Sequence, residues 1–564
     1  MSALDRRGTA VASTLDRPLT PLRVAVIGCG PKGLFCIQQL ATLLEKGNFG
    51  RPLQVAIFEP AEFPGAGVVY DSRQPHYLRM NFAAEHIHVR KSEADGSSLL
   101  QWLRQEHPEF AAAGQFVPRA IVGEYLHDSY LTTMNRLSKH GTVDRIKEQV
   151  LDLVDTDIGW RVTTDNGRGY HGFDEVLLAV GHEGWRGTAT DGRQMGSFDI
   201  SHVYPTDVQL SLAMAPARSY VALRGIGLTA IDAILALTEG RGGVFRPGQK
   251  AWHYQTSGNE PARIYPYSRS GRPMLSKPMA RQMSVSNLEE MWEYHSGRLA
   301  ALAHLRPLGF SDEIWPLVEA AAEAALQAVG GSGAAEWFKS WLHCCPSGDE
   351  LRNQISASVE VATGKKEPDA AWAMGEAWRR LYPTLVGLIS HDGLTKGSWP
   401  HFRTLAAEME RIAFGPPVEN CRKFLSLVDC GLVDLEFLQG NVASHESGFR
   451  ELRTNCGCRI VRIDRHINAV LPSPASSNPH GPLRSLAQRG KLVPHASGCG
   501  YRIDRLGRPV TATGQTLCGV TLVGRPTEGA VLGNDTLNSE LHDGPSRWAS
   551  NIVEQLQRVE RSTL

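Results

Sequence analysis

The chain has 564 residues, with 59 basic and 59 acidic side chains and 42% hydrophobic residues. This size predicts a globular protein of two or more domains, and the balanced charge argues against nucleic-acid binding. The N-terminus lacks the apolar core of a signal peptide, and no later apolar run is long enough to cross a bilayer, so a cytoplasmic enzyme without a membrane partner is expected. The ten cysteines show neither a zinc spacing nor a disulfide framework, so we expect mostly buried thiols and no metal site.

The first motif is a glycine turn with the sequence RVAVIGCGPKG. A strand over 23–27 is expected to lead into Gly28, which makes the tight turn, while Gly30 leaves room for a pyrophosphate. Gly33 lets the following helix, over 32–44, pack closely, and the positive N-terminal end of that helix faces the anion. The residues expected to hold this dinucleotide are Gly28, Gly30, Pro31, Lys32 and Gly33.

A second strand and a long loop follow this turn. The segment 53–60, LQVAIFEP, ends on Glu59, where a ribose hydroxyl requires an acceptor. The loop over 63–82 is rich in glycine and proline, which lets an extended backbone lie against a flat ligand. A buried-type strand over 174–181 ends in glycine and resembles the strand that closes the first nucleotide fold of two-dinucleotide flavoproteins. The further cofactor contacts predicted here are Glu59, Pro60, Gly65, Gly67 and Gly181.

A second glycine turn lies at 220–232, YVALRGIGLTAID, with Ala230 in place of the third glycine. Its predicted contacts are Gly225, Gly227, Leu228 and Thr229. The next strand runs through 262–273 and brings no carboxylate to the ribose; Ser268, Arg269 and Arg272 stand there instead. Arginine pairs with a 2′-phosphate that a carboxylate would repel, so NADPH is predicted rather than NADH. The alternative is a solvated arginine-serine turn.

Beyond these turns the chain becomes helical and then returns to strands. Apolar residues at helical spacing predict a helical insertion over 278–427, whose stripes fit either a substrate pocket or a homodimer face. Strand-like segments follow at 432–440 and 458–473, and the tail predicts a strand over 519–523 and a helix over 546–558. The tail residues expected near the flavin are Gly524, Thr527, Glu528, Gly529 and Asn534.

These elements predict an α/β fold with two Rossmann-like dinucleotide-binding domains, one for FAD and one for NADPH, and a helical insertion. The predicted organisation is a disordered N-terminus over 1–18, an FAD domain in two parts over 19–205 and 476–564, an NADPH domain over 206–277 with return strands over 428–475, and the insertion over 278–427.

The motifs together resemble an FAD/NAD(P)-binding flavoprotein group that carries a GxGPxG turn, a PGAGxVY loop and an LRMN segment. Here these stand at 28–33, 64–70 and 78–81. The likeness covers most of the chain, through further segments at 117–126, 224–232, 268–273, 414–417, 524–529 and 533–538. The group looks related to flavin-dependent N-hydroxylating monooxygenases, including those that oxidise the amine of aspartate in natural-product pathways.

This resemblance implies that FAD is reduced by NADPH and reacts with O2 to give a C4a-hydroperoxyflavin, which delivers one oxygen atom to the amine of a small amino acid. Asn81, beside Met80, is predicted to contact the flavin or the peroxide, with a loop-capping role as the alternative. His86 can act as an acid or base, or be structural. Arg79, Arg90 or Arg119 can clamp a substrate carboxylate, with Arg79 the nearest to Asn81. The candidate catalytic residues are therefore Asn81, Arg79 and His86, with Met80 and Asn81 also at the cofactor.

Three other functions fit part of these motifs. An NADPH-dependent flavoprotein reductase shares both turns, but Cys29 lies inside the first turn and Cys36 in its helix, so neither forms a redox pair. A carbon or Baeyer-Villiger monooxygenase shares every cofactor motif and differs only in the acceptor. A nucleotide-sensing protein without chemistry would not need both cofactor turns.

Overall fold

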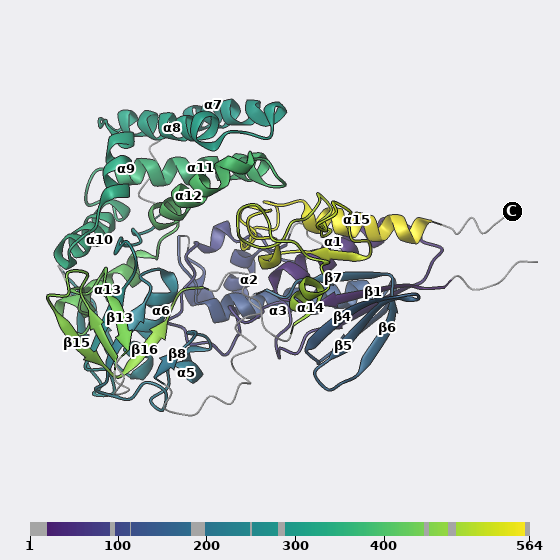
Figure 1. Ribbon diagram of the computed structural model, residues 1–564, viewed down its shortest axis with the longest axis horizontal. Helices are drawn as coiled ribbons and strands as arrows, with labels where there is room; N and C mark the ends of the chain where they lie inside the picture. The colour runs from purple at the N-terminus through teal and green to yellow at the C-terminus, as the bar shows by residue number, and fades with distance from the viewer. Residues whose placement is uncertain are drawn as a thin grey trace, which may run out of the picture.

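The computed structural model describes residues 20–90, 96–112, 114–181, 198–248, 251–279, 288–444, 450–471 and 481–558. The predicted disorder over 1–18 lies outside these residues. Figure 1 shows one sheet, near which the described part of the chain begins and ends, a second sheet at the opposite end of the molecule, and a layer of helices above the second sheet.

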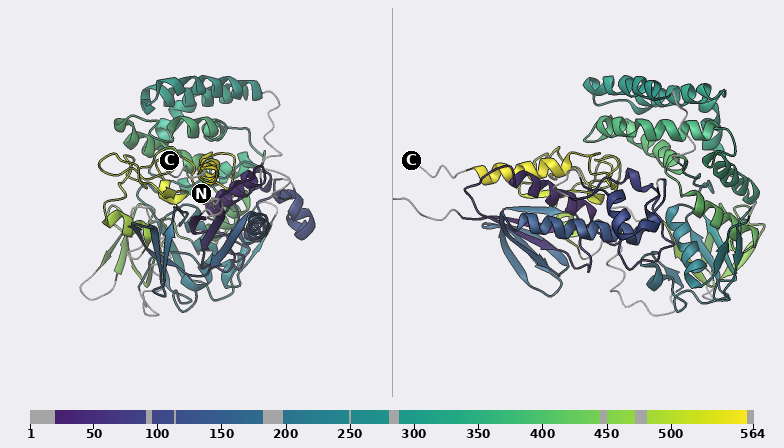
Figure 2. Two further views of the ribbon diagram at one scale, coloured as in Figure 1. Left: turned by 90° about the vertical axis from the view of Figure 1, so that its right-hand side faces the viewer. Right: turned by 180° about the vertical axis from the view of Figure 1, so that it is seen from behind.

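The first sheet is parallel and has the strand order β17-β7-β1-β2-β3. Its members are β1 (Leu22–Ile27), β2 (Leu53–Phe58), β3 (Gly141–Ile146), β7 (Glu175–Leu178) and β17 (Val520–Leu522). The central strands β1, β7 and β17 are almost continuously buried, as expected for a parallel sheet covered by helices, whereas the edge strand β3 is partly exposed. The covering helices are α1 (Pro31–Leu44), α2 (Leu99–Glu106), α3 (Arg119–Leu137) and α15 (Gly544–Gln557). Helices α1 and α15 pack together although they lie near opposite ends of the chain (Figure 2).

A three-stranded antiparallel sheet connects β3 to β7. It contains β4 (Val150–Thr156), β5 (Gly159–Thr164) and β6 (Gly169–Phe173), and α14 (Pro482–Gln488) packs on β4. Side chains from this layer share a hydrophobic core with the first sheet, so both belong to one nucleotide-binding unit.

The second parallel sheet has the order β12-β9-β16-β8. Its members are β8 (Asp199–Ile200), β9 (Tyr220–Arg224), β12 (Arg263–Tyr267) and β16 (Arg465–Asn468). Because β8 pairs with β16, this unit takes in residues before 206, which the predicted boundary assigned to the first domain. Helix α6 (Leu228–Leu237) follows β9, and α5 (Thr206–Gln209), β10 (Val244–Arg246) and β11 (His253–Gln255) complete the nearby elements.

An antiparallel sheet of β13 (Asn441–Ser444), β14 (Arg450–Arg453) and β15 (Ile460–Ile463) precedes β16. Two sequence expectations are wrong here. The segment 432–440 forms no strand, and only Val433 bridges to Ile264. Cys456 and Cys458 form a disulfide between β14 and β15, and three of the eight free cysteines are buried, so most are not buried thiols.

The helical segment contains α7 (Glu289–Ala300), α8 (Trp315–Ala328), α9 (Ala334–His343), α10 (Gly348–Ala362), α11 (Ala370–Ile389), α12 (Trp399–Ala413) and α13 (Val418–Asp429). Helix α11 lies at its centre and packs on α7, α8, α9 and α12 around the buried Trp378. Helices α10 and α13 instead share a core with the second sheet, so the insertion proper consists of the other five. Short turns complete the described elements: η1 (Ala84–His86), η3 (Pro108–Phe110), η4 (Glu239–Arg241), η6 (Ala301–Leu305), η7 (Phe310–Ile314), η8 (Lys396–Ser398) and η10 (Arg525–Thr527).

The predicted fold class is confirmed: two parallel Rossmann-like sheets and a helical insertion form a mixed α/β protein. In the described part of the chain, no helix is both long and apolar enough to span a membrane.

Candidate active site

A cavity of about 1420 Å³ lies where the two nucleotide-binding units and the helical insertion meet. Of the predicted cofactor residues, those that line it are Gly28, Gly30, Pro31, Lys32, Glu59, Pro60, Gly67, Met80, Asn81, Gly181, Leu228, Thr229, Gly524, Glu528, Gly529 and Asn534. The wall from the insertion includes Trp372, Tyr382, Phe402 and Glu410. The insertion was predicted to form either a substrate pocket or a homodimer face, and its contribution to the cavity wall favours the substrate pocket.

The first glycine turn is built by close backbone approach. Gly28 has φ +84°, and a Cβ there would lie 2.6 Å from the Ala179 carbonyl oxygen. A Cβ on Gly33 would lie 2.5 Å from the Gly28 carbonyl oxygen, so both positions require glycine. Gly30 is the N-cap of α1, and no side chain caps that helix. The N-terminus of α1 therefore faces open space on the cavity, which fits the pyrophosphate of FAD.

Glu59 is fixed at the carboxyl end of β2. Its Oε2 accepts a hydrogen bond from the Cys29 N–H at 2.8 Å, and its Oε1 accepts one from the Ala61 N–H at 2.9 Å. These contacts hold the carboxylate at the edge of the cavity, where an acceptor for a ribose hydroxyl is expected.

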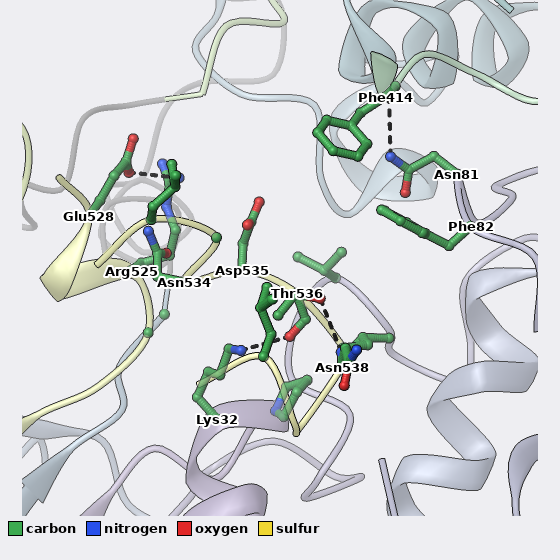
Figure 3. A pocket seen from close by; sticks show the side chains of 18 of the residues that line it. Lys32, Asn81, Phe82, Phe414, Arg525, Glu528, Asn534, Asp535, Thr536 and Asn538 are labelled. Carbon is green, nitrogen blue, oxygen red and sulfur yellow. Dashed lines mark hydrogen bonds and ion pairs between the residues drawn. The ribbon is translucent and has the colours of Figure 1, made fainter. Parts of the chain in front are cut away.

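The C-terminal tail closes the cavity beside this turn. Lys32 Nζ donates to the Thr536 carbonyl oxygen at 2.7 Å and thereby ties α1 to the tail (Figure 3). Burial lowers the pKa of Lys32 to about 8. Thr527 lies outside the cavity lining. Its hydroxyl donates to the Gly524 carbonyl oxygen at 2.8 Å, so it stabilises the turn without contacting the cavity. Gly65 acts similarly, with its N–H donating to the Cys29 carbonyl oxygen at 2.6 Å.

The structure brings Asn81 and His86 to the cavity but not Arg79. Asn81 Nδ2 donates to the Phe414 carbonyl oxygen at 3.4 Å, which joins the loop to the insertion. Burial lowers the pKa of His86, which favours its neutral form near neutrality. The Arg79 guanidinium lies over the Phe110 ring at 5.7 Å and 3.8 Å from a carboxylate oxygen of Glu419, so the prediction that it reaches the reaction centre is not supported.

The other two candidate carboxylate clamps are already ion-paired. Arg119 lines the cavity, but its guanidinium lies 2.7 Å from the buried Asp232 and donates to the Tyr204 hydroxyl at 3.0 Å. Arg90 pairs with Asp128 and does not line the cavity. Neither side chain is poised to bind a substrate carboxylate without losing an existing partner.

The second glycine turn reaches the same cavity through Leu228 and Thr229 at the start of α6. Gly225 has φ +120°, and Gly227 is the N-cap of the helix, which fits the predicted nucleotide turn. Both turns therefore open on one space, as hydride transfer between two bound cofactors requires.

In the serine-arginine turn after β12, Arg272 does not have the phosphate-binding role that was predicted for it. The Arg272 guanidinium donates two hydrogen bonds of 2.9 Å to Glu408 and others to the carbonyl oxygens of Leu342 and Cys344. This arginine therefore fastens the insertion and is not available for a 2′-phosphate. Arg269 is exposed, and Ser268 Oγ accepts from the Gly271 N–H at 3.1 Å. Arg269 is thus the better candidate for the phosphate.

We predict that Arg269→Ala raises the Kd for NADPH about tenfold and leaves the Kd for NADH unchanged, because a guanidinium-phosphate contact is worth roughly 1.5–3 kcal/mol. Titration of the holoprotein with each nucleotide checks this result. Arg104→Ala removes an exposed arginine from α2 and serves as the matched control. Equal losses for both nucleotides would assign Arg269 to another part of the cofactor.

Sequence reasoning missed the charged groups that the insertion and its flanks bring to the cavity. Glu410 of α12 lines the cavity, where desolvation by the surrounding protein and the charge of Asp535 raise the pKa of its carboxyl group to about 8. Asp535 and Lys277 also line the space. Glu410 and Lys277 lie in segments without a nucleotide-binding motif, so the local sequence carried no signal for them. Asp535 lies in the tail segment 533–538, which was predicted to resemble the flavoprotein group but not to place this carboxylate in the cavity. Within the described ranges, no group of three or more His, Cys, Asp or Glu side chains could hold a metal ion.

Residues 25–183 match the FAD-NAD(P)-binding family, so the first unit is an FAD-NAD(P)-binding domain. Together with the second glycine turn on the same cavity, this defines the class: an oxidoreductase that binds FAD and NAD(P).

The chain is 28% identical to an L-aspartate N-monooxygenase (nitrosuccinate-forming) of Streptomyces davaonensis, over 84% of this chain and 85% of that protein. It is also 28% identical to the nitrosuccinic acid synthase npaA of Aspergillus oryzae, over 90% and 88%. Among solved structures it is similar to the reduced ornithine hydroxylase PvdA of Pseudomonas aeruginosa, with a TM-score of 0.49 and 11% identity over 95% of this chain and all of that one. The predicted resemblance to FAD-NAD(P)-binding proteins and to N-oxidising monooxygenases is confirmed.

Proposed function

We propose that this protein is an FAD- and NADPH-dependent monooxygenase that uses O2 to oxidise the amine of aspartate to a hydroxylamine, nitroso or nitro product in natural-product biosynthesis. The observation that carries the proposal is the single cavity shared by both dinucleotide turns and roofed by the insertion. The names of the two relatives support aspartate as the substrate.

The chain's own residues hold and align the cofactors. The turn at Gly28 and Gly30 receives the FAD pyrophosphate, Glu59 accepts from its ribose, and Lys32 adds positive charge beside the tail. Leu228 and Thr229 lie where NADPH must enter. Bound FAD supplies the redox chemistry, in which it accepts a hydride from NADPH and activates O2.

Aromatic side chains on the wall exclude water from the amine. The Phe82 and Phe414 rings lie 5.9 Å apart, and Tyr382 meets Phe414 edge-on at 5.3 Å. A cavity wall that excludes water limits the loss of reducing equivalents to hydrogen peroxide and allows the substrate amine to remain unprotonated.

An amine attacks only when it has lost its proton. His86 and Glu410 both face the cavity and can accept that proton. Burial lowers the pKa of His86 and raises the pKa of Glu410 to about 8, so at neutral pH the imidazole is the available base, and Glu410 becomes one as the pH rises past 8.

The disulfide-reductase form of the reductase alternative requires a pair of reactive thiols. Cys499 is the one cysteine among the described residues that line the cavity, and burial raises its pKa. Burial also raises the pKa of Cys29 and of Cys36, which keeps both thiols protonated. These environments favour oxygenation over disulfide exchange.

Oxidation of aspartate by the purified holoprotein tests the proposal. With NADPH, ¹⁸O2 and L-aspartate, we expect NADPH consumption to yield a nitrogen-oxidised succinate that carries the label, detected by mass spectrometry, and little hydrogen peroxide. Lysine and ornithine serve as amine controls. NADPH consumption that gives only hydrogen peroxide with every amine, or that depends on a disulfide substrate, would contradict it.

A further inference from the structure

Lys277 is a buried lysine whose ammonium group has no hydrogen-bond partner in the described part of the protein. Its side chain is 7% exposed, and it lines the cavity. Its backbone N–H donates to the Pro416 carbonyl oxygen at 2.9 Å, which fixes this segment against the loop after α12. An ammonium group is costly to bury unless an anion accompanies it.

Two aromatic rings hold the Lys277 ammonium at the wall. Nζ lies 3.2 Å from the centre of the Phe82 ring and 5.4 Å from that of Phe414. Cation-π contacts of this kind orient the ammonium but do not neutralise it. Burial and the charge of Arg379 lower the pKa of Lys277, and the nearby Glu410 and Glu376 carboxylates offset this only in part. A further anion that binds beside Lys277 would therefore favour its charged form.

The neighbouring cations already have partners, unlike Lys277. Arg379 pairs with Glu376 at 2.8 Å and donates to the Ala413 carbonyl oxygen at 2.8 Å. Arg380 pairs with Glu376 and Glu289. Lys277 is therefore the cation in this part of the wall that is poised to accept an anion from the cavity.

This position lies apart from the residues that fit the FAD phosphates. Figure 3 shows Phe82 and Phe414 together with Asn81 on one side of the pocket, and Lys32 with the tail residues on another. An anionic group bound beside Phe82 would therefore be part of the ligand that fills the space next to Asn81 and not a phosphate of FAD.

We propose that Lys277 binds a carboxylate of the amino-acid substrate and thereby selects an anionic amine. The inference rests on the proposed function and names the residue that recognises its substrate class. The contact is a charge-assisted hydrogen bond from Nζ to a carboxylate oxygen, with the Phe82 and Phe414 rings fixing the direction of the ammonium.

Calorimetric binding of L-aspartate and of succinate to the FAD-loaded protein tests the assignment. Lys277→Met should raise the Kd of both dicarboxylates about tenfold to hundredfold, because the partner of a charged hydrogen bond is lost. Lys277→Arg should recover part of this loss. Lys339→Met, which changes an exposed lysine on α9, is the matched control and should bind as the parent does.

FAD content and thermal midpoint show whether each variant is folded. Lys277→Met should be at least as heat-stable as the parent, since it removes an unpaired buried charge; Lys277→Gln keeps a polar side chain and replaces it if the methionine variant does not fold.

The outcomes test two proposals separately: that Lys277 binds the substrate carboxylate, here called the anchor, and that the protein oxidises aspartate. Unchanged dicarboxylate binding in Lys277→Met, or a loss confined to NADPH, overturns the anchor and leaves the proposed function standing. Succinate and aspartate binding that depends on Lys277, without oxidation of aspartate, overturns the proposed function and leaves the anchor standing. A parent protein that binds neither dicarboxylate overturns both.

Discussion

Gly28→Val should abolish FAD binding, so the purified variant should be colourless and should not oxidise NADPH. The new Cβ would lie 2.6 Å from the Ala179 carbonyl oxygen, in a residue held at φ +84°, where a β-branched side chain is strongly disfavoured. Neither β1 nor β7 can move away, because they pair along Val24–Ile27 in the centre of the sheet. The strain of roughly 1–3 kcal/mol and the clash add together, so occupancy should fall by at least about a hundredfold. The ratio of flavin to protein absorbance measures it.

Gly167→Ala is the matched control for this variant. Gly167 also has a left-handed backbone, with φ +78°, but an added Cβ there meets no atom within 4 Å. The substitution should cost roughly 1–2 kcal/mol of stability and leave the FAD content unchanged. Full FAD occupancy in Gly28→Val would show that the turn does not carry the pyrophosphate.

The nucleotide turns could be predicted from sequence because their geometry is local. The approach of Gly33 to Gly28 spans five residues, and the φ of Gly28 is a property of the turn itself. The strands on each side are buried apolar runs, which are typical of a parallel sheet. The predicted fold class is therefore confirmed, and most of the residues predicted to contact cofactors at the turns line the cavity.

The failed predictions depend on contacts between distant segments. The segment 432–440 has a strand-like pattern, but Leu435, Phe437 and Leu438 are buried by packing, and Val433 makes the sole bridge there. Side-chain burial was therefore mistaken for strand pairing, which short apolar runs do not distinguish. Lys277 and Glu410 reach the cavity because the insertion folds over it, and no local spacing predicts that approach.

Arg272 shows the same limit at a single residue, because its partner Glu408 lies 136 positions away. A serine-arginine turn after a nucleotide strand favours a 2′-phosphate site on local grounds. The tertiary structure instead places a buried carboxylate within 2.9 Å of that guanidinium. The Trp341 indole N–H donates to the same carboxylate at 2.9 Å, so β12, α9 and α12 meet at one charged cluster.

Arg272→Met should destabilise the protein by up to roughly 3–5 kcal/mol, because it removes the bidentate partner of the buried Glu408 and leaves only Arg411, whose Nε lies 3.6 Å from that carboxylate. The side chains of this pair are 13% and 9% exposed, so water cannot replace the arginine. Differential scanning calorimetry measures the loss. Arg352→Met is the matched control: its ion pair with Asp429 is 41% and 36% exposed and should contribute less than about 1 kcal/mol.

Adding Glu408→Gln to Arg272→Met should recover part of the stability, because the orphaned charge is then removed. The affinity for NADPH relative to NADH should stay unchanged in the folded fraction of both variants. A variant as stable as the parent but selectively weakened toward NADPH would return Arg272 to the phosphate site. The expected pattern instead assigns Arg272 to fastening the insertion over the cavity, so that the roof carrying Glu410 and Phe414 stays in place while Arg269 contacts the nucleotide.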